Sequence, residues 1–136
     1  MKTERKGFRQ MVDEAKARIK TISLEEAKSR LGSDRVVFVD LRDVRELERE
    51  GMIPGAFHAP RGMLEFWVDP ESPYYKPVFT ADKTFILYCQ ADWRGVLAAA
   101  ALGDMGMENV LHLEGGYGEW RKAGAPTGPK PEKTRT

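Results

Sequence analysis

The chain has 136 residues, of which 41% are hydrophobic and 32% are charged, and its formal net charge is +1. This size suits one domain with a single hydrophobic core. The balanced charge gives no broad basic surface for nucleic acid or an anionic membrane, and no apolar run approaches the roughly 18 residues that a membrane span requires. We therefore expect one domain that binds neither nucleic acid nor a membrane.

The start of the chain and its cysteine content favour a cytoplasmic protein. Residues 1–10 lack the apolar core of a secretory signal. Cys89 is the only cysteine in the sequence, so no internal disulfide can form. His58 and His112 are the only histidines and are too few for a rich metal cluster. We expect a reducing setting, no metal and no cofactor.

Apolar spacing predicts the first elements of the fold. Residues 8–19 place apolar side chains on one stripe of a helix. We interpret residues 1–20 as a helical extension that packs on the domain, with a partner-binding helix as the alternative. Ser23 and Glu26 have the spacing of a capping box, which marks the start of a short helix. The continuous apolar run 36–39 is typical of a strand buried on both faces.

Strands and helices alternate along the rest of the chain. We expect strands near residue 57 and over 84–88 and 109–112, and helices over 44–50, 61–68, 95–105 and 117–122. This alternation predicts an α/β fold of three layers, with a mostly parallel five-stranded sheet covered by helices on both faces. After Gly124 the composition changes to Pro, Gly, Lys and Thr, so we interpret 127–136 as a disordered tail and 21–126 as the domain.

Cys89 lies where a predicted strand ends and the chain turns into a helix. Ligands of open α/β sheets bind beyond the carboxyl ends of the strands. Backbone amides at the helix start and the positive charge of Arg94 favour a thiolate, which predicts a lowered pKa for Cys89. The alternative is that Cys89 is only a small apolar residue after a buried strand.

Four segments in the same order resemble the rhodanese (sulfurtransferase) family over about residues 22–126. They are Val-Asp-Leu-Arg at 39–42, Gly-Met-Ile-Pro-Gly-Ala at 51–56, the loop from Cys89 to Arg94, and Leu-Glu-Gly-Gly-Tyr-Gly-Glu-Trp at 113–120. Met52 replaces the histidine that is usual in the second segment. The resemblance implies a single-domain rhodanese-like fold.

The resemblance also implies an activity. Cys89 would accept a sulfane sulfur as a persulfide from a small donor, thiosulfate or a persulfide, and pass it to a thiol or protein acceptor. Substrate binding would fall to the loop residues Gln90, Ala91, Asp92, Trp93, Arg94 and Gly95. The residues that could support the pocket are Asp40, Arg42, His58 and Arg61. We expect a monomer or a weak homodimer.

Each supporting residue has a simpler interpretation. Asp40 and Arg42 follow a strand and are expected to form a structural pair that holds loops. His58 is expected to be a hydrogen-bonded structural residue, as is His112 within its strand. Arg61 could collect an anionic donor or lie on the surface.

The loop departs from the family pattern Cys-Arg-x-Gly-x-Arg. Gln90 removes a cation, and Asp92 replaces a glycine at a position where φ could be positive. Asp92 would also oppose the charge of Arg94, so we expect weaker use of thiosulfate than of a neutral or thiol-borne donor. Alternatively, Asp92 points into solvent. Trp93 is interpreted as part of the pocket rim, or as a cover for the helix start.

Two other functions compete with sulfur transfer. Phosphatases that resemble this fold have five residues between the cysteine and the arginine, whereas this chain has four between Cys89 and Arg94. The smaller loop suits one sulfur atom better than a tetrahedral phosphate. The second competitor is a catalytically weak or inactive binding module in which Cys89 is incidental.

Overall fold

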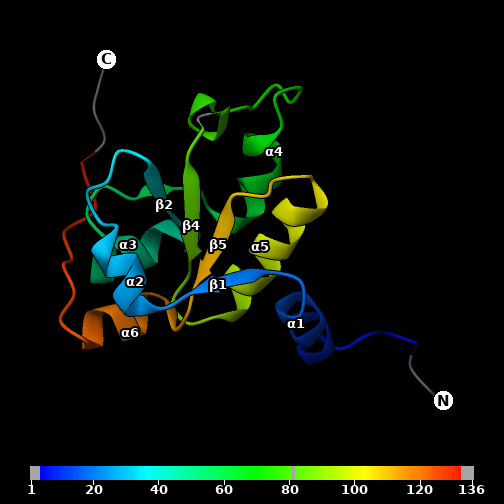
Figure 1. The fold of residues 1–136 in the computed structure, drawn as a ribbon, viewed down its shortest axis with the longest axis horizontal. Helices are drawn as coiled ribbons and strands as arrows, with labels where there is room; N and C mark the ends of the chain where they lie inside the picture. Colours follow the sequence, from blue (N-terminus) through cyan, green and yellow to red (C-terminus); the bar gives the residue numbers. More distant parts are fainter. Residues whose placement is uncertain (1–3, 81, 133–136) are drawn as a thin grey trace.

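The computed structural model describes residues 4–80 and 82–132. Five strands form one parallel sheet in the order β1-β5-β4-β2-β3 (Figure 1). The strands are β1 (Lys20–Ile22), β2 (Val36–Asp40), β3 (Phe57–His58), β4 (Thr84–Tyr88) and β5 (Val110–Leu113). The predicted α/β fold with a parallel five-stranded sheet is confirmed.

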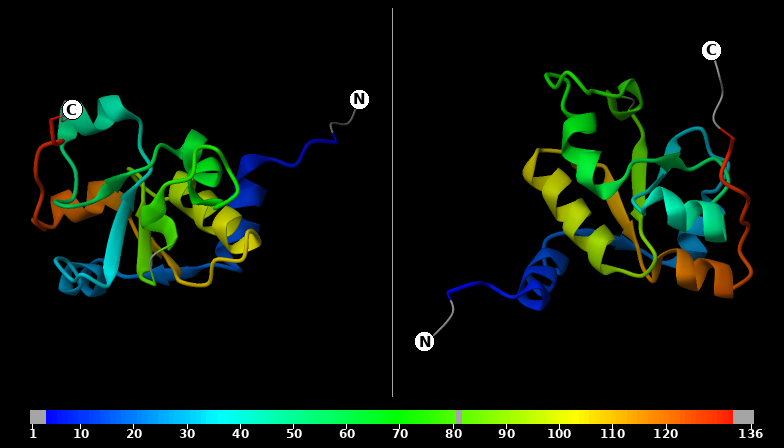
Figure 2. Two further views of the ribbon diagram at one scale, coloured as in Figure 1. Left: turned by 90° about the horizontal axis from the view of Figure 1, so that it is seen from above. Right: turned by 180° about the vertical axis from the view of Figure 1, so that it is seen from behind.

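Helices cover both faces of the sheet (Figure 2). They are α1 (Phe8–Lys16), α2 (Leu24–Ser29), α3 (Val44–Glu50), α4 (Leu64–Val68), α5 (Trp93–Asp104) and α6 (Gly116–Lys122), with 3-10 turns at Arg61–Met63 and Pro77–Thr80. α4 and α5 pack on one face, α2 and α6 pack on the other, and α3 lies beside α6. Across the described residues, no helix has the length and apolar character needed to cross a bilayer.

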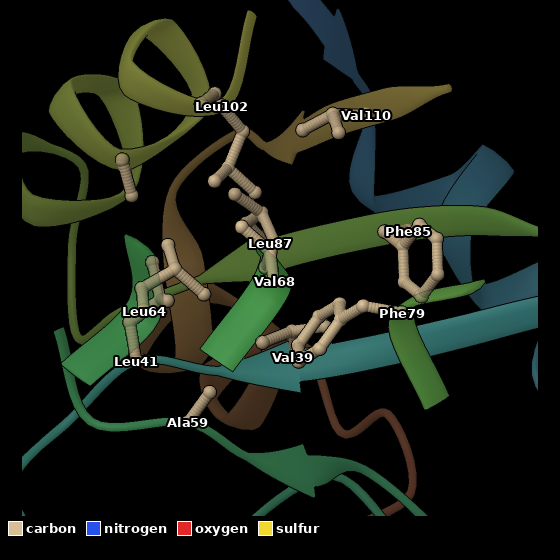
Figure 3. Packing of buried hydrophobic residues seen from close by; sticks show 12 residues of the cluster. Val39, Leu41, Ala59, Leu64, Val68, Phe79, Phe85, Leu87, Leu102 and Val110 are labelled. Atoms are coloured by element: carbon tan, nitrogen blue, oxygen red, sulfur yellow. The ribbon is translucent and has the colours of Figure 1, made fainter. Parts of the chain in front are cut away.

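The central strand β4 contributes to both sides of the core. Phe85 and Leu87 point into the cluster beneath α4 and α5 (Figure 3), whereas Ile86 and Tyr88 join the cluster beneath α2 and α6. All four side chains are fully buried. Successive residues of a strand face opposite sides, so a strand covered on both faces needs an unbroken apolar run. Because β4 is held from both sides, Cys89 at its end has a fixed position.

Helix α1, near the start of the chain, packs against α5. Val12 and Ala15 of α1 are buried against Val96 and Ala100 of α5. Ser23 caps α2 and accepts a hydrogen bond from the Glu26 amide at 3.2 Å. Strand β1, between the two helices, was not predicted, because three residues are too few to show a strand period.

The C-terminal segment is attached beyond the boundary we expected at residue 126. Met52 and Gly128 exchange two backbone hydrogen bonds, of 2.8 and 2.9 Å. Trp120 donates its indole N–H to the carbonyl of Pro126 at 2.7 Å. This pairing does not fit a tail that is disordered from residue 127. Residues 133–136 of that expected tail lie outside the described residues.

Candidate active site

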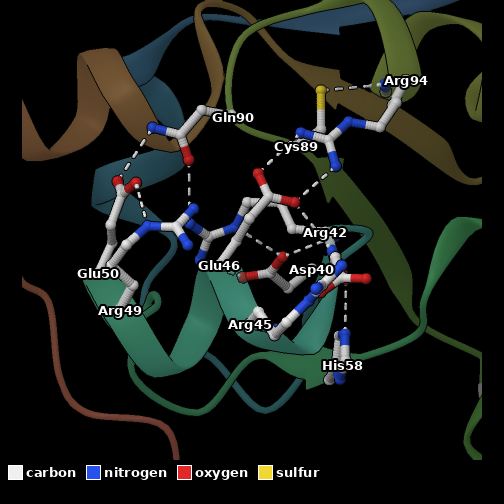
Figure 4. Close-up of polar contacts among 12 residues, drawn as sticks. Asp40, Arg42, Arg45, Glu46, Arg49, Glu50, His58, Cys89, Gln90 and Arg94 are labelled. Carbon is white, nitrogen blue, oxygen red and sulfur yellow. Dashed lines mark hydrogen bonds and ion pairs between the residues drawn. The ribbon is translucent and has the colours of Figure 1, made fainter.

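Cys89 lies at the carboxyl end of β4, where the chain turns into α5. The Gly95 N–H donates to Cys89 Sγ at 3.3 Å, so the loop folds back on its own first residue (Figure 4). The helix begins at Trp93, earlier than the expected Gly95, because the carbonyl of Asp92 already accepts the first helical bond, from Val96. Trp93 and Arg94 therefore belong to the first helical turn. We call residues 89–91 the inner half of the loop and 92–95 the outer half.

The pKa of the Cys89 thiol differs from our expectation. Burial raises this pKa above its usual value, although the Gly95 N–H, the charge of Arg94 and the amides of Ala91 and Arg94 favour the thiolate. Cys89 is only 1% exposed, so the thiolate loses most of its hydration. The predicted lowering of the Cys89 pKa was wrong, because the sequence shows where the helix begins but not how deeply the sulfur is buried.

The glycine pair before α6 brings a second helix against the loop. The Tyr117 amide donates to the carbonyl of Cys89 at 2.8 Å, and the Gly118 amide donates to that of Gln90 at 2.9 Å. Gly116 has a φ of +64°, and a Cβ there would lie 2.5 Å from the carbonyl oxygen of Cys89. A side chain at this position is excluded both by backbone conformation and by space. The signature segment 113–120 thus serves to support the inner half of the loop.

A buried ion pair also fixes the inner half. Arg42 donates to the Asp40 carboxylate at 2.8 and 3.0 Å, and both side chains are fully buried. Its guanidinium also donates to the carbonyl of Gly51 at 2.7 Å and to Gln90 Oε1 at 3.1 Å. The Gln90 amide then donates to Glu50 at 3.2 Å. Asp40 and Arg42 form the expected structural pair, and Gln90 links that pair to the loop.

Arg94 pairs with a residue that sequence reasoning missed. It donates to both carboxylate oxygens of Glu46 in α3, at 2.8 and 3.0 Å (Figure 4). These hydrogen bonds from Arg94 hold the pKa of Glu46 below its usual range, against the effect of burial. The spacing of Asp43 and Glu46 is that of a capping box, which could have placed Glu46 in the first turn of a helix after β2. It could not have placed Glu46 opposite Arg94.

Asp92 does not have the backbone conformation we expected. Its φ is −130°, so the expectation of a positive φ was wrong. Its carboxylate accepts a hydrogen bond from the Gly115 amide at 2.9 Å and lies 3.4 Å from His112 Nε2. Asp92 therefore braces the outer half of the loop against the segment that precedes α6.

His112 lies next to the Asp92 carboxylate. It is 3% exposed, and burial lowers its pKa. Within the described part of the chain, its Nε2 has no hydrogen-bond partner. A Cβ at Gly95 would lie 2.7 Å from the imidazole Cδ2, so the ring occupies the space that a glycine leaves. His112 is a buried residue of β5, and its contact with the helix start could not be predicted from the sequence.

Trp93 contacts the N-terminal helix. Its ring packs edge-to-face on Phe8, with ring centroids 4.7 Å apart, and the guanidinium of Arg9 lies 5.3 Å from the Trp93 ring. Trp93 remains 51% exposed. It therefore joins α1 to the outer half of the loop, a contact that the expected pocket rim did not include.

The two remaining candidates have structural partners. His58 Nε2 lies 2.7 Å from the carbonyl oxygen of Arg42, consistent with its expected structural role. Arg61 pairs with Glu65 at 2.7 Å in the next helical turn. Neither contact reaches Cys89, so the structure does not join these two residues to the loop directly.

Comparison with known proteins agrees with this architecture. The sequence profile of the Rhodanese-like domain matches residues 23–123. The chain therefore belongs to the rhodanese-like family, and it carries a single, buried cysteine at the end of β4.

Three relatives illustrate the range of similarity. Human thiosulfate:glutathione sulfurtransferase is 31% identical over 106 residues, which cover 74% of this chain and 91% of that protein. A sulfurtransferase of Allochromatium vinosum is 29% identical over 109 residues, 79% of this chain and 94% of that protein. A solved structure from Rhodopseudomonas palustris, of unknown function and described as a possible tyrosine phosphatase, is 48% identical, with a TM-score of 0.89 over 94% of this chain and 98% of that one.

Proposed function

We propose that this protein is a single-domain sulfurtransferase in which Cys89 carries a sulfane sulfur as a persulfide. The observation that carries the proposal is the Gly95 N–H directed at Cys89 Sγ. Neighbouring amides and Arg94 also favour negative charge on that sulfur. A persulfide anion needs such donors around it, and the sulfurtransferases of human and Allochromatium origin support the assignment.

The chemistry requires two displacements at sulfur. The Cys89 thiol first loses its proton to water, and the thiolate attacks the sulfane sulfur of the donor. A new bond forms to Sγ while the S–S bond of the donor breaks, and the donor leaves as sulfite or as a thiolate. An acceptor thiolate then attacks the outer sulfur and regenerates the Cys89 thiolate. In this scheme the amides of residues 90–95 bind the charged sulfur, and Arg94 stabilises the end of the loop.

The single cysteine determines how the cycle ends. No second thiol exists in the sequence to resolve a persulfide as an internal disulfide. The sulfur must therefore leave to an external nucleophile, such as a small thiol or a cysteine of another protein. A reducing cytoplasmic setting is part of this proposal, because it keeps Cys89 available between cycles.

A binding module with little activity is the second candidate, and one observation favours it. Cys89 is almost completely buried, and burial raises its pKa, so the resting protein holds little thiolate at neutral pH. An inert core cysteine has the same properties.

A phosphatase is less well supported. The R. palustris protein is described as a possible tyrosine phosphatase. In this chain only four residues separate Cys89 from Arg94, and both terminal nitrogens of Arg94 are engaged by Glu46. A phosphate group would have to compete with that carboxylate. We expect no Cys89-dependent hydrolysis of p-nitrophenyl phosphate.

The test is the intact mass of the protein after incubation with thiosulfate and, separately, with glutathione persulfide. Sulfur transfer predicts a gain of about 32 Da that dithiothreitol reverses and that Cys89→Ser lacks, since only a thiolate takes this step. Release of the added sulfur to a fresh thiol completes the cycle. No gain with either donor would exclude the sulfurtransferase and leave the binding module.

A further inference from the structure

Both terminal nitrogens of Arg94 are occupied by a carboxylate. They donate to the two oxygens of Glu46, an arrangement that matches the planar guanidinium to the planar carboxylate. Arg94 is the cation of the loop, and its side chain is 40% exposed, whereas that of Glu46 is 19% exposed. The arginine that the loop exposes to solvent is therefore already paired with Glu46.

Glu46 is held in place independently of Arg94. Its Oε1 also accepts a hydrogen bond from the backbone amide of Asp43 at 2.9 Å, which completes the capping box of α3. The next residue, Leu47, is 1% exposed and anchors the helix in the core. A carboxylate fixed by its own helix cannot turn away when an anion approaches Arg94.

Other charged side chains also lie near the loop, among them Arg9, whose guanidinium lies 5.3 Å from the Trp93 ring. Arg42 is neutralised by Asp40 in the core. Glu50 accepts from Gln90 in the inner half, and Asp92 lies in the outer half. Glu50 is itself paired with Arg121 at 3.5 Å and with Arg49 at 3.9 Å, so its carboxylate is balanced by two cations.

We infer that Glu46 is a specificity-determining residue that makes Cys89 select sulfane sulfur carried by an uncharged or weakly charged thiol over dianionic thiosulfate. The inference rests on the proposed sulfurtransferase function and names its donor class. Glu46 acts through Arg94. By pairing with Arg94 it neutralises the positive charge that would attract the sulfonate group of thiosulfate. The backbone amides of the loop remain available to bind the sulfur. The residue responsible for weak use of thiosulfate is then Glu46, whereas our sequence interpretation assigned that effect to Asp92.

The test compares wild type with Glu46→Gln, because glutamine keeps the capping hydrogen bond and removes only the charge. Rates of the mass gain at Cys89 are measured with thiosulfate and with the persulfide of 2-mercaptoethanol, a thiol without other charges. Glu46→Gln is expected to raise the thiosulfate rate roughly tenfold at low salt, and less at high salt, because one opposing charge is lost near a dianion. The rate with the uncharged thiol's persulfide should change by less than about twofold.

Glu48→Gln is the matched control, since it removes a negative charge from an exposed position of the same helix. It should leave both rates unchanged. An unchanged or lower thiosulfate rate in Glu46→Gln would overturn the inference. Melting curves of the three proteins show whether a lower rate reflects loss of the fold. In that case the ratio of the thiosulfate rate to the persulfide rate within the same variant decides, because a smaller folded fraction lowers both rates equally.

Alkylation of Cys89 separates this inference from the proposed function. Iodoacetate and iodoacetamide have similar size but differ in charge, and neither requires sulfur transfer. Glu46→Gln should raise the ratio of the iodoacetate rate to the iodoacetamide rate several-fold, whereas Glu48→Gln should not. If no protein gains mass with either sulfur donor, the proposed function fails, and donor selection fails with it. An unchanged alkylation ratio would show that Glu46 does not control the charge at Cys89, whatever the donors do.

Discussion

The two halves of the loop after Cys89 are held by different kinds of contact. The inner half is fixed by Arg42, which is fully buried, and by the α6 amides that bind its carbonyls. The outer half is fixed by side chains that remain partly exposed, in the pairs Arg94–Glu46 and Trp93–Phe8. The two halves adjoin in the chain, yet the arginine that anchors the inner half is buried, whereas the side chains that anchor the outer half remain partly exposed.

This difference separates the support of the site from its selectivity. A charged group that is buried away from water needs a partner of opposite charge, because an unpaired charge in the core costs several kcal/mol. Changing one member of a partly exposed pair costs little stability, because water solvates the partner that is left unpaired. The inner half should therefore determine whether the protein folds, and the outer half what it binds.

The largest expected effect comes from removing the cation of the inner half. Arg42→Met leaves the buried Asp40 carboxylate without its partner, and we expect a loss of about 3–5 kcal/mol in the free energy of unfolding. Urea unfolding measures this. Arg49→Met, an exposed arginine of α3, should stay within about 0.5 kcal/mol of wild type. A loss below about 1 kcal/mol in Arg42→Met would mean that the pair does not support the loop.

A smaller effect is expected at the glycine that lets α6 approach. Gly116→Ala places a methyl group against the carbonyls of the inner half at a positive φ, and we expect a loss of about 2–4 kcal/mol. Gly124→Ala has a comparable φ of +79° with no atom within 4 Å, so it reports the backbone strain alone, about 1 kcal/mol. Equal losses in the two variants would show that the close approach of α6 is not needed.

The smallest effect concerns the buried histidine beneath the outer half. Because burial lowers the folded-state pKa of His112 below its ordinary 6.5, the unfolded chain binds the proton more readily. The contribution of His112 to the free energy of unfolding is therefore constant above about pH 6.5, and the free energy of unfolding falls as the pH drops below 6.5. The nearby Asp92 carboxylate opposes this effect and Lys16 adds to it. Unfolding free energies between about pH 7.5 and 5.5 should fall more for wild type than for His112→Gln. Equal slopes would show that another group titrates.

The features that follow from local pattern could be predicted from the sequence. The buried strands 36–39 and 84–88, the cap at Ser23 and the place of Cys89 all depend on neighbours in the chain. The pair Arg94–Glu46 joins residues 48 apart, and Asp92 meets Gly115 across 23. Such contacts depend on how α3 and α6 pack in the folded protein, and a local sequence pattern does not indicate this packing. The pKa of Cys89 was misjudged for the same reason, because its burial is a property of the whole fold.

The edges of the sheet have a consequence of their own. β1 and β3, the outermost strands, are only three and two residues long. Unpaired backbone groups on a long, flat edge are templates on which another chain can add a strand, the first step of aggregation. Here such a template is too short to hold an intruding strand in register. The protein therefore offers its own copies little opportunity to polymerise through the sheet.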